Sequence, residues 1–194
     1  MYSFPAIAAN LVTLLGYDGY YAFTCEDGFG RAMANGRNHG LSDEEAAAVF
    51  LYTVDSINGI SPFRVVNDML RDNNRPLLRR YAPLLTAMRN GIGKLPRYRG
   101  WVRRRIHVDA RTMAELEAMT AYRETAFMSA SKETADAFKG NVMLMILSVS
   151  GRDIELLSAF PEEKEVIFLP GTGFLLEELT KGAKTTVLFL NETT

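Results

Sequence analysis

Two carboxylates, those of Glu163 and Glu165, stand two residues apart at the start of an apolar run in this chain of 194 residues. In a strand, residues i and i+2 point to the same face, so the spacing predicts that both side chains line one cleft. Carboxylates fixed in a cleft can stabilise positive charge that develops at a reacting carbon, as in glycoside hydrolysis. Paired glutamates are also common on solvated surfaces, so this pair indicates a catalytic site only in combination with the motifs upstream of it.

An arginine on the inward face of a predicted strand is the second candidate. Residues 101–108 read as a strand in which Val102, Arg104 and Ile106 share one apolar face. A guanidinium on an apolar face needs an anionic partner, and its fork of donors fits phosphate. Arg99 is a rival by local sequence, but the alternation favours Arg104. A stacked or salt-bridged arginine is the structural alternative.

Two serines form the third candidate. Ser129 ends a strand predicted over residues 125–129, and Ser131 can cap a helix that runs to about Phe138. A strand end and a helix cap would explain both serines without any chemistry. Their place between Arg104 and the two glutamates makes them candidates for a site.

In this order the motifs resemble the arginine-serine-glutamate class of mono-ADP-ribosyltransferases. The resemblance rests on Leu95-Pro96-x-Tyr98-x-Gly100-x-Val102-x-Arg104, on Phe127-Met128-Ser129-Ala130-Ser131, and on Phe160-x-x-Glu163-x-Glu165 with the following strand and Pro170-Gly171-Thr172-x-Phe174. The chain departs from the family pattern at three positions: Arg103 replaces the usual aromatic residue, Arg105 the usual glycine and Ala130 the usual threonine.

The resemblance implies that NAD is the substrate and that no metal is needed. It implies a catalytic set of Arg104, Ser129, Glu163 and Glu165. The NAD contacts that it implies come from Arg104, Arg105, Phe127, Ser129, Ser131, Phe138 and Glu165, and acceptor recognition from Phe160 and Glu163. Glu165 would stabilise the ribosyl cation formed as the bond to nicotinamide breaks, and Glu163 would orient or deprotonate the acceptor. Phe138 is equally well explained as a core residue.

A glutamate at the position of Glu163 goes with arginine acceptors in this family. The resemblance therefore implies transfer of ADP-ribose to protein arginine by a toxin or effector domain. Such a domain would be secreted or delivered into a target cell, would act in its cytoplasm, and could have a cognate immunity or inhibitor protein. The alternatives are ADP-ribosylation of RNA, NAD glycohydrolysis, and a non-enzymatic interaction module with a basic face. His39-Gly40 resembles the start of a diphtheria-toxin-like motif, but Leu41 replaces its threonine.

The charge of the chain is unevenly distributed. The formal net charge is −1, yet residues 1–70 carry −5, residues 71–105 carry +10 from eleven bases and one acid, and residues 106–194 carry −6. A basic block between acidic flanks indicates an anionic ligand or pairing with the chain's own acids. RNA is the most specific alternative for an anionic ligand of this block, although the sequence contains no known nucleic-acid-binding motif.

The order of elements predicts an α+β fold, with N-terminal helices packed on a C-terminal, mostly antiparallel sheet-rich core. We expect a single domain over residues 1–194, helical to about residue 94 and sheet-rich from about residue 95. Capping boxes predict helix starts at Ser42 and Thr112. The Gly- and Asn-rich residues 25–40 predict a loop, and residues 91–96 a linker. A proline is expected to split the helical region 76–88 at Pro83.

The remaining composition excludes some classes. Cys25 is the single cysteine, so no disulfide within the chain is possible, and one cysteine with two histidines cannot build an ordinary zinc site. No apolar run is long enough to predict a membrane span. Residues 4–15 are apolar but lack the basic start of a signal peptide, so we expect a core helix there.

Overall fold

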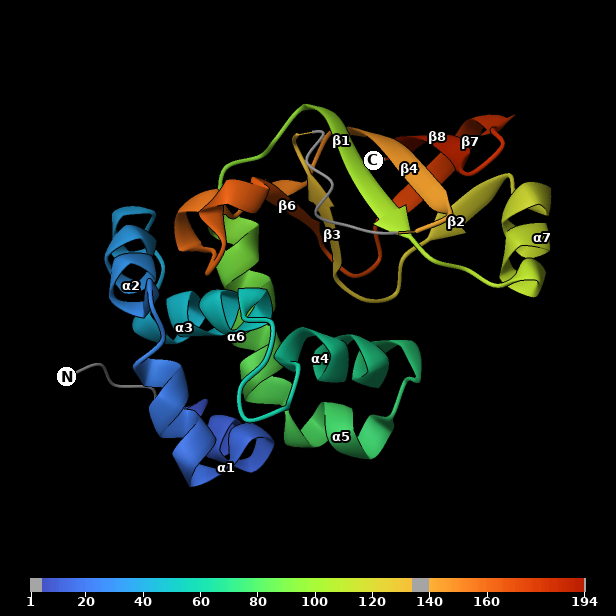
Figure 1. The fold of residues 1–194 in the computed structure, drawn as a ribbon. Helices are drawn as coiled ribbons and strands as arrows, with labels where there is room; N and C mark the ends of the chain where they lie inside the picture. Colours follow the sequence, from blue (N-terminus) through green and yellow to red (C-terminus); the bar gives the residue numbers. More distant parts are fainter. Residues whose placement is uncertain (1–4, 134–139, 194) are drawn as a thin grey trace. The chain divides into compact units, whose positions relative to one another are not determined.

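The computed structural model describes residues 5–133 and 140–193 of the chain, which fall into two compact units. The helical unit consists of Met1–Pro96 and Ile154–Glu162, and the sheet unit of Arg97–Asp153 and Glu163–Thr194. Helices precede the sheet along the chain, so the predicted α+β class is confirmed (Figure 1). In the described part of the chain, no helix combines the length and the apolar character needed to cross a membrane.

The described residues of the helical unit form six helices and the short 3-10 turn η1, and the turn η2 (Pro161–Glu163) crosses into the sheet unit. The six helices and η1 are α1 (Ala8–Thr24), α2 (Phe29–Asn38), α3 (Asp43–Thr53), α4 (Pro62–Arg71), α5 (Arg75–Arg80), α6 (Ala82–Lys94) and η1 (Glu155–Leu157). Helix α3 starts at the predicted capping box, in which Ser42 and Glu45 bond to each other's backbone N–H groups. Every residue from Glu45 to Thr53 is buried, so α3 is the central helix of this unit.

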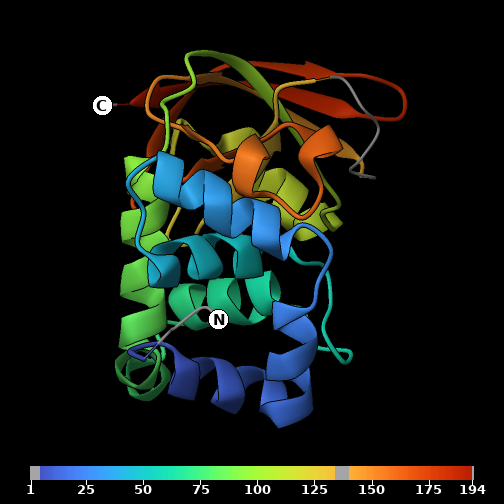
Figure 2. The same cartoon turned by 90° about the vertical axis from the view of Figure 1, so that its left-hand side faces the viewer.

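Two glycine-containing segments differ from the sequence predictions, and a third contains a bend in a helix. Residues 25–40 were expected to be a loop, but α2 occupies most of them because Phe29, Ala32, Met33 and Gly36 recur at helical spacing and are buried. The expected linker at 91–96 is wrong as well, since α6 continues to Lys94. In α1, Gly16 has φ 74°, and Figure 2 shows the helix in two pieces that meet at a bend.

In its described residues, the sheet unit contains eight strands joined in one sheet, together with one helix. The strands are β1 (Gly100–Ile106), β2 (Ala121–Arg123), β3 (Met128–Ser131), β4 (Val142–Ser148), β5 (Arg152–Asp153), β6 (Glu165–Phe168), β7 (Gly173–Lys181) and β8 (Thr186–Thr193), and the helix is α7 (Ala110–Ala118). Their order across the sheet is β2-β7-β8-β4-β1-β3-β6-β5, and every neighbouring pair is antiparallel except β4 with β8. Helix α7 starts at Asp109, whose carboxylate accepts from Thr112 N, and not at the predicted Thr112.

Strand alternation gives the sheet unit one buried core. Val102 on β1, Ile146 on β4 and Leu190 on β8 lie in this core with Val166 and Phe168 of β6. Met113, Leu116 and Met119, from α7 and the residue after it, pack against the same cluster. The predicted inward face of β1 is confirmed, because Val102 is opposite Ile146 and Arg104 is opposite Leu144. The core therefore fixes which side chains of β1, β3 and β6 are left to form a site.

Candidate active site

Glu165 is a buried acid at the first position of β6. Its side chain and backbone together are 7% exposed. The strand that carries it is fixed on both sides, since β6 pairs with β3 and with β5 and every β6 residue is buried. Ser131 is directly opposite Glu165 on β3, and Ser129 is opposite Ile167. Side chains opposite one another or two apart share a face, so Ser129, Ser131 and Glu165 lie on one side of this part of the sheet.

Burial raises the pKa of the Glu165 carboxyl to about 7, because a charged carboxylate is poorly solvated there. A hydrogen bond from the Ser129 side chain lowers the pKa and partly offsets burial. The neighbouring charge of Glu163 raises the pKa further, whereas the charge of Arg104 lowers it. A carboxyl with this pKa changes charge near neutral pH and is held beside a serine, an acid and a guanidinium. Such a perturbed acid is typical of functional sites.

Glu163 lies close to Glu165 but not by the predicted route. We expected both glutamates on one strand, yet Glu163 ends the short turn η2 (Pro161–Glu163) and β6 begins only at Glu165. Between them Lys164 has φ 48°, in the left-handed region, so simple alternation does not apply. That expectation is therefore wrong, and a turn brings the two carboxylates together.

The end of β3 holds this turn in place. The Ser131 hydroxyl donates a 2.7 Å hydrogen bond to the Glu163 carbonyl oxygen, and Lys132 N donates to the Lys164 carbonyl oxygen at 3.0 Å. The Lys164 ammonium also forms an ion pair with the exposed side chain of Glu133. Sequence reasoning did not find Lys164, because a lysine at positive φ has no local signal. Its place between two glutamates was the only hint.

Arg104 occupies the point at which β1 and β3 separate. Within these described strands, the two pair only at Arg103 and Ser131. The half-buried Arg104 guanidinium spans the opening and donates from Nη1 to the Ser129 carbonyl oxygen at 2.7 Å. A guanidinium has five N–H donors, so one such bond leaves capacity for an anionic ligand such as a phosphate.

The other predicted site residues are placed differently. Arg105 is opposite Met143 and lies on the face of β1 away from Arg104. Phe127 is 2% exposed and belongs to the buried residues before β3. Phe160 is half-buried in the helical unit, where its N–H donates to Ser158 Oγ. Phe138 lies outside the described residues. The structure thus brings together Arg104, Ser129, Ser131, Glu163 and Glu165, and it puts Arg105 on the other face of β1.

The donor set of this cluster suits an organic anion with sugar hydroxyl groups better than a metal ion. In the part of the chain that the structure describes, no group of three His, Cys, Asp or Glu residues is arranged to hold a metal. A guanidinium can bind phosphate oxygens, and a buried carboxylate can accept from a hydroxyl group. The cluster can therefore hold a nucleotide and stabilise positive charge that develops on its sugar.

Comparisons with known proteins agree with this chemistry. The sequence pattern of the family described as "NAD:arginine ADP-ribosyltransferase" matches residues 30–194. A relative from Pseudomonas putida, the NAD(+)--protein-arginine ADP-ribosyltransferase Tre1, is 30% identical over 153 residues, which are 78% of this chain and 30% of that protein. This chain thus spans less than a third of the length of that relative.

Solved structures show the same fold. The type III effector XopAI from Xanthomonas axonopodis pv. citri superposes with a TM-score of 0.77 at 21% identity, over 100% of this chain and 90% of that one. The ADP-ribosyltransferase HopU1 of Pseudomonas syringae superposes with a TM-score of 0.71 at 21% identity, over 94% of this chain and 87% of that one. At this level of identity the similarity establishes the fold, and residue roles must be argued from the site itself.

Proposed function

The chain belongs to the NAD:arginine ADP-ribosyltransferase family, and from this premise we propose that it transfers ADP-ribose from NAD to an arginine side chain of a protein. The observation that carries the proposal is the buried Glu165 carboxyl, bonded to Ser129 and close to the charges of Glu163 and Arg104. The activity for which the relative Tre1 is named supports arginine on a protein as the acceptor. We assign the catalytic roles to Arg104, Ser129, Glu163 and Glu165.

Arg104 would bind the diphosphate of NAD. Its guanidinium is half-buried and already oriented by the Ser129 carbonyl oxygen, so little side-chain freedom is lost when an anion binds. Removal of a guanidinium that holds a desolvated phosphate costs about 2–5 kcal/mol. The electrostatic match favours NAD over neutral nucleosides.

Glu165 would act on the ribose next to the nicotinamide. As the bond between ribose C1′ and the nicotinamide nitrogen breaks, its electron pair leaves with nicotinamide and positive charge develops on the sugar. An ionised carboxylate fixed beside the sugar stabilises that charge more in the transition state than in the ground state. Ser129 positions this carboxylate through its hydrogen bond.

Glu163 would act on the acceptor. An arginine nitrogen forms the new bond to C1′ and must lose a proton, which the Glu163 carboxylate can accept. Water in place of the arginine would give NAD hydrolysis. Because Glu163 ends the turn η2 and Glu165 begins β6, the two neighbouring carboxylates come from different elements, and each can serve a different reactant.

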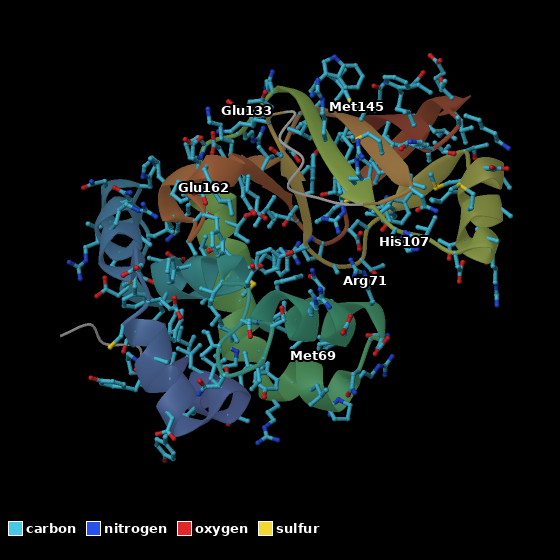
Figure 3. The ribbon with its side chains drawn as sticks, viewed as in Figure 1. Met69, Arg71, His107, Glu133, Met145 and Glu162 are labelled. Atoms are coloured by element: carbon cyan, nitrogen blue, oxygen red, sulfur yellow. The ribbon has the colours of Figure 1, made fainter. Side chains whose placement is uncertain are left out.

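The proposal is tested with NAD labelled in its ADP-ribose part and a cell lysate. We expect label in macromolecules with the parent protein and none with Glu165→Gln. Glu162→Gln is the matched control, because Glu162 is exposed in the same segment and should leave transfer unchanged (Figure 3). Equal labelling by the parent and Glu165→Gln, or no NAD turnover by the parent, contradicts the proposal.

The same labelled sample identifies the class of acceptor. One half is treated with protease and the other with ribonuclease. Label that is lost with protease and kept with ribonuclease supports protein as the acceptor, whereas the opposite result assigns the label to RNA. Release of label by hydroxylamine under mild conditions, compared with synthetic ADP-ribosyl arginine, then tests the arginine linkage.

We further propose that the domain acts as a toxin or effector inside a target cell. XopAI, with which the fold superposes, is itself a type III effector, and this supports delivery. A cognate inhibitor that covers the site is a natural partner for such an activity. Expression of the parent in a bacterial host should arrest growth, and Glu165→Gln should relieve the arrest. Normal growth with an enzyme that is active in the lysate would contradict the toxin role.

A further inference from the structure

The sheet unit has a second face that the core does not use. Seven apolar side chains from four adjacent strands alternate with the core residues and point away from them: Trp101, Met143, Met145, Leu147, Leu175, Val187 and Phe189. We call these residues the outer face. Trp101 is 46% exposed, Leu175 45% and Leu147 36%. Met145 lies on β4 within this face (Figure 3).

The outer face is apolar, and within the described residues of the sheet unit no helix covers it. The Trp101 and Phe189 rings contact edge to face with centroids 6.2 Å apart. The apolar residues of α7 pack on the buried core instead. An antiparallel sheet ordinarily presents polar side chains on its solvent side, and a contiguous apolar patch on a soluble protein marks an interaction surface.

Charges at the two ends of one cross-strand row give the outer face a polarity. The row runs Arg103–Met145–Phe189–Glu178 across β1, β4, β8 and β7, as the strand registers show. Three strand spacings separate Arg103 from Glu178, about 14 Å, so they cannot pair within one copy. Among the residues that the structure describes, neither takes part in an ion pair. The row therefore ends in a cation on one side and an anion on the other.

This arrangement is complementary to itself. A two-fold axis can lie against the outer face, parallel to the strands and midway between β4 and β8. Rotation about this axis places β1 of one copy over β7 of the other, and β4 of one copy over β8 of the other. Arg103 then faces Glu178 of a second copy, and Met145 faces Phe189, each pair occurring twice as in an isologous interface. The strands of both copies remain aligned, as in ordinary face-to-face sheet packing. We propose that the outer face docks on a second copy of this chain.

The size of the outer face sets the expected strength. Four strands at about 4.8 Å spacing give the outer face a width of about 19 Å. A patch of this width is smaller than a standard interface, which buries about 800 Å² on each partner. The dimer should therefore be weak and its population should depend on concentration, with a dissociation constant in the micromolar range. The proposal does not rest on the enzymatic function, because none of its residues has an assigned catalytic role; Arg103 is opposite Ser131 on β3, at the border of the site around Glu165.

Sedimentation velocity over about a hundred-fold range of protein concentration tests the proposal. The parent should shift from its 21.7 kDa monomer towards twice that mass. Arg103→Glu alone and Glu178→Arg alone should each stay monomeric, because like charges then meet across the axis. An equimolar mixture of these two variants should associate again, since opposite charges meet at both ends. The double variant should also dimerise.

Two results overturn the proposal. One is a monomeric parent at every concentration, which would leave the outer face to a different protein. The other is a dimer that Arg103→Glu and Glu178→Arg do not weaken, which would place the interface elsewhere. Both side chains point away from the core, so circular dichroism should show parent-like folding, and recovery in the mixture excludes misfolding as the cause of dissociation.

Discussion

The hydroxyl of Ser131 donates a 2.7 Å hydrogen bond to the carbonyl oxygen of Glu163. The same serine is directly opposite Glu165 across the pair of strands β3 and β6. One buried residue therefore fixes the position of the first glutamate relative to the second. Because Ser129 bonds to Glu165 itself, the two serines support different carboxylates.

Ser131→Ala should reduce transfer to the acceptor more than NAD hydrolysis. The substitution leaves the Glu163 carbonyl without its donor and loosens the turn, at a cost of about 1–3 kcal/mol in the free energy of unfolding. Ser129→Ala is the matched control and should reduce both activities, because it acts on Glu165. The measurement compares label transfer to an arginine peptide with nicotinamide release in its absence. Equal losses of both activities in Ser131→Ala would contradict a separate role for Glu163.

The rate of NAD hydrolysis should rise with pH through about 7, because Glu165 must be ionised to stabilise the ribosyl cation. Glu163→Gln removes a negative charge that raises the pKa of Glu165, so the midpoint should move to lower pH. Ser129→Ala removes a hydrogen bond that lowers the pKa, so its residual activity should have a midpoint at higher pH. Midpoints that move together, or not at all, would show that another group controls the profile.

The same buried carboxyl should make the protein less stable as pH rises. The folded pKa of Glu165, about 7, exceeds its ordinary value of 4.5, so the folded state binds more protons between these two pH values. Stability is then highest below the unfolded pKa and falls as pH rises to the folded pKa, by about 3 kcal/mol in total. Glu165→Gln should match the parent in urea unfolding at pH 5 and exceed it at pH 8. A constant difference at both pH values would argue against a raised pKa.

Local signals predicted much of the fold and part of the site. The capping box at Ser42 and the alternation along β1 were sufficient to place α3 and the inward Arg104. Both features depend on neighbouring residues in the chain, which is why a single sequence reveals them. The order of the arginine, serine and glutamate motifs identified the family before any geometry was known.

Features set by distant contacts could not be predicted. Glycine and asparagine in residues 25–40 favoured a loop, but burial of Phe29 and Met33 outweighed these weak preferences. The left-handed Lys164 depends on bonds to β3, more than thirty residues earlier in the chain. The outward position of Arg105 follows from the same alternation that placed Arg104, yet the family pattern suggested a shared ligand.

Arg104, and not Arg99, should determine the affinity for NAD. Arg99 is exposed before β1 begins, whereas Arg104 is held against the Ser129 carbonyl oxygen. Arg104→Ala should weaken NAD binding by about 2–5 kcal/mol, as expected for loss of a desolvated phosphate contact. Arg99→Ala should leave the dissociation constant nearly unchanged. Isothermal titration with NAD measures both variants, and a larger effect at Arg99 would show that the diphosphate lies elsewhere.

Two glycines of α6 should respond in opposite directions to the same substitution. A Cβ atom at Gly91 would lie 2.9 Å from the Glu45 carbonyl oxygen and 2.9 Å from Val49 Cγ2, so α6 approaches α3 too closely for alanine. At Gly93 nothing lies within 4 Å of that position. Gly91→Ala should therefore destabilise the protein by about 1–3 kcal/mol through overpacking. Gly93→Ala should stabilise it by about 0.5–1 kcal/mol, because alanine favours the helix. Urea unfolding of both variants measures the difference, and a stable Gly91→Ala protein would mean that these helices are not in close contact.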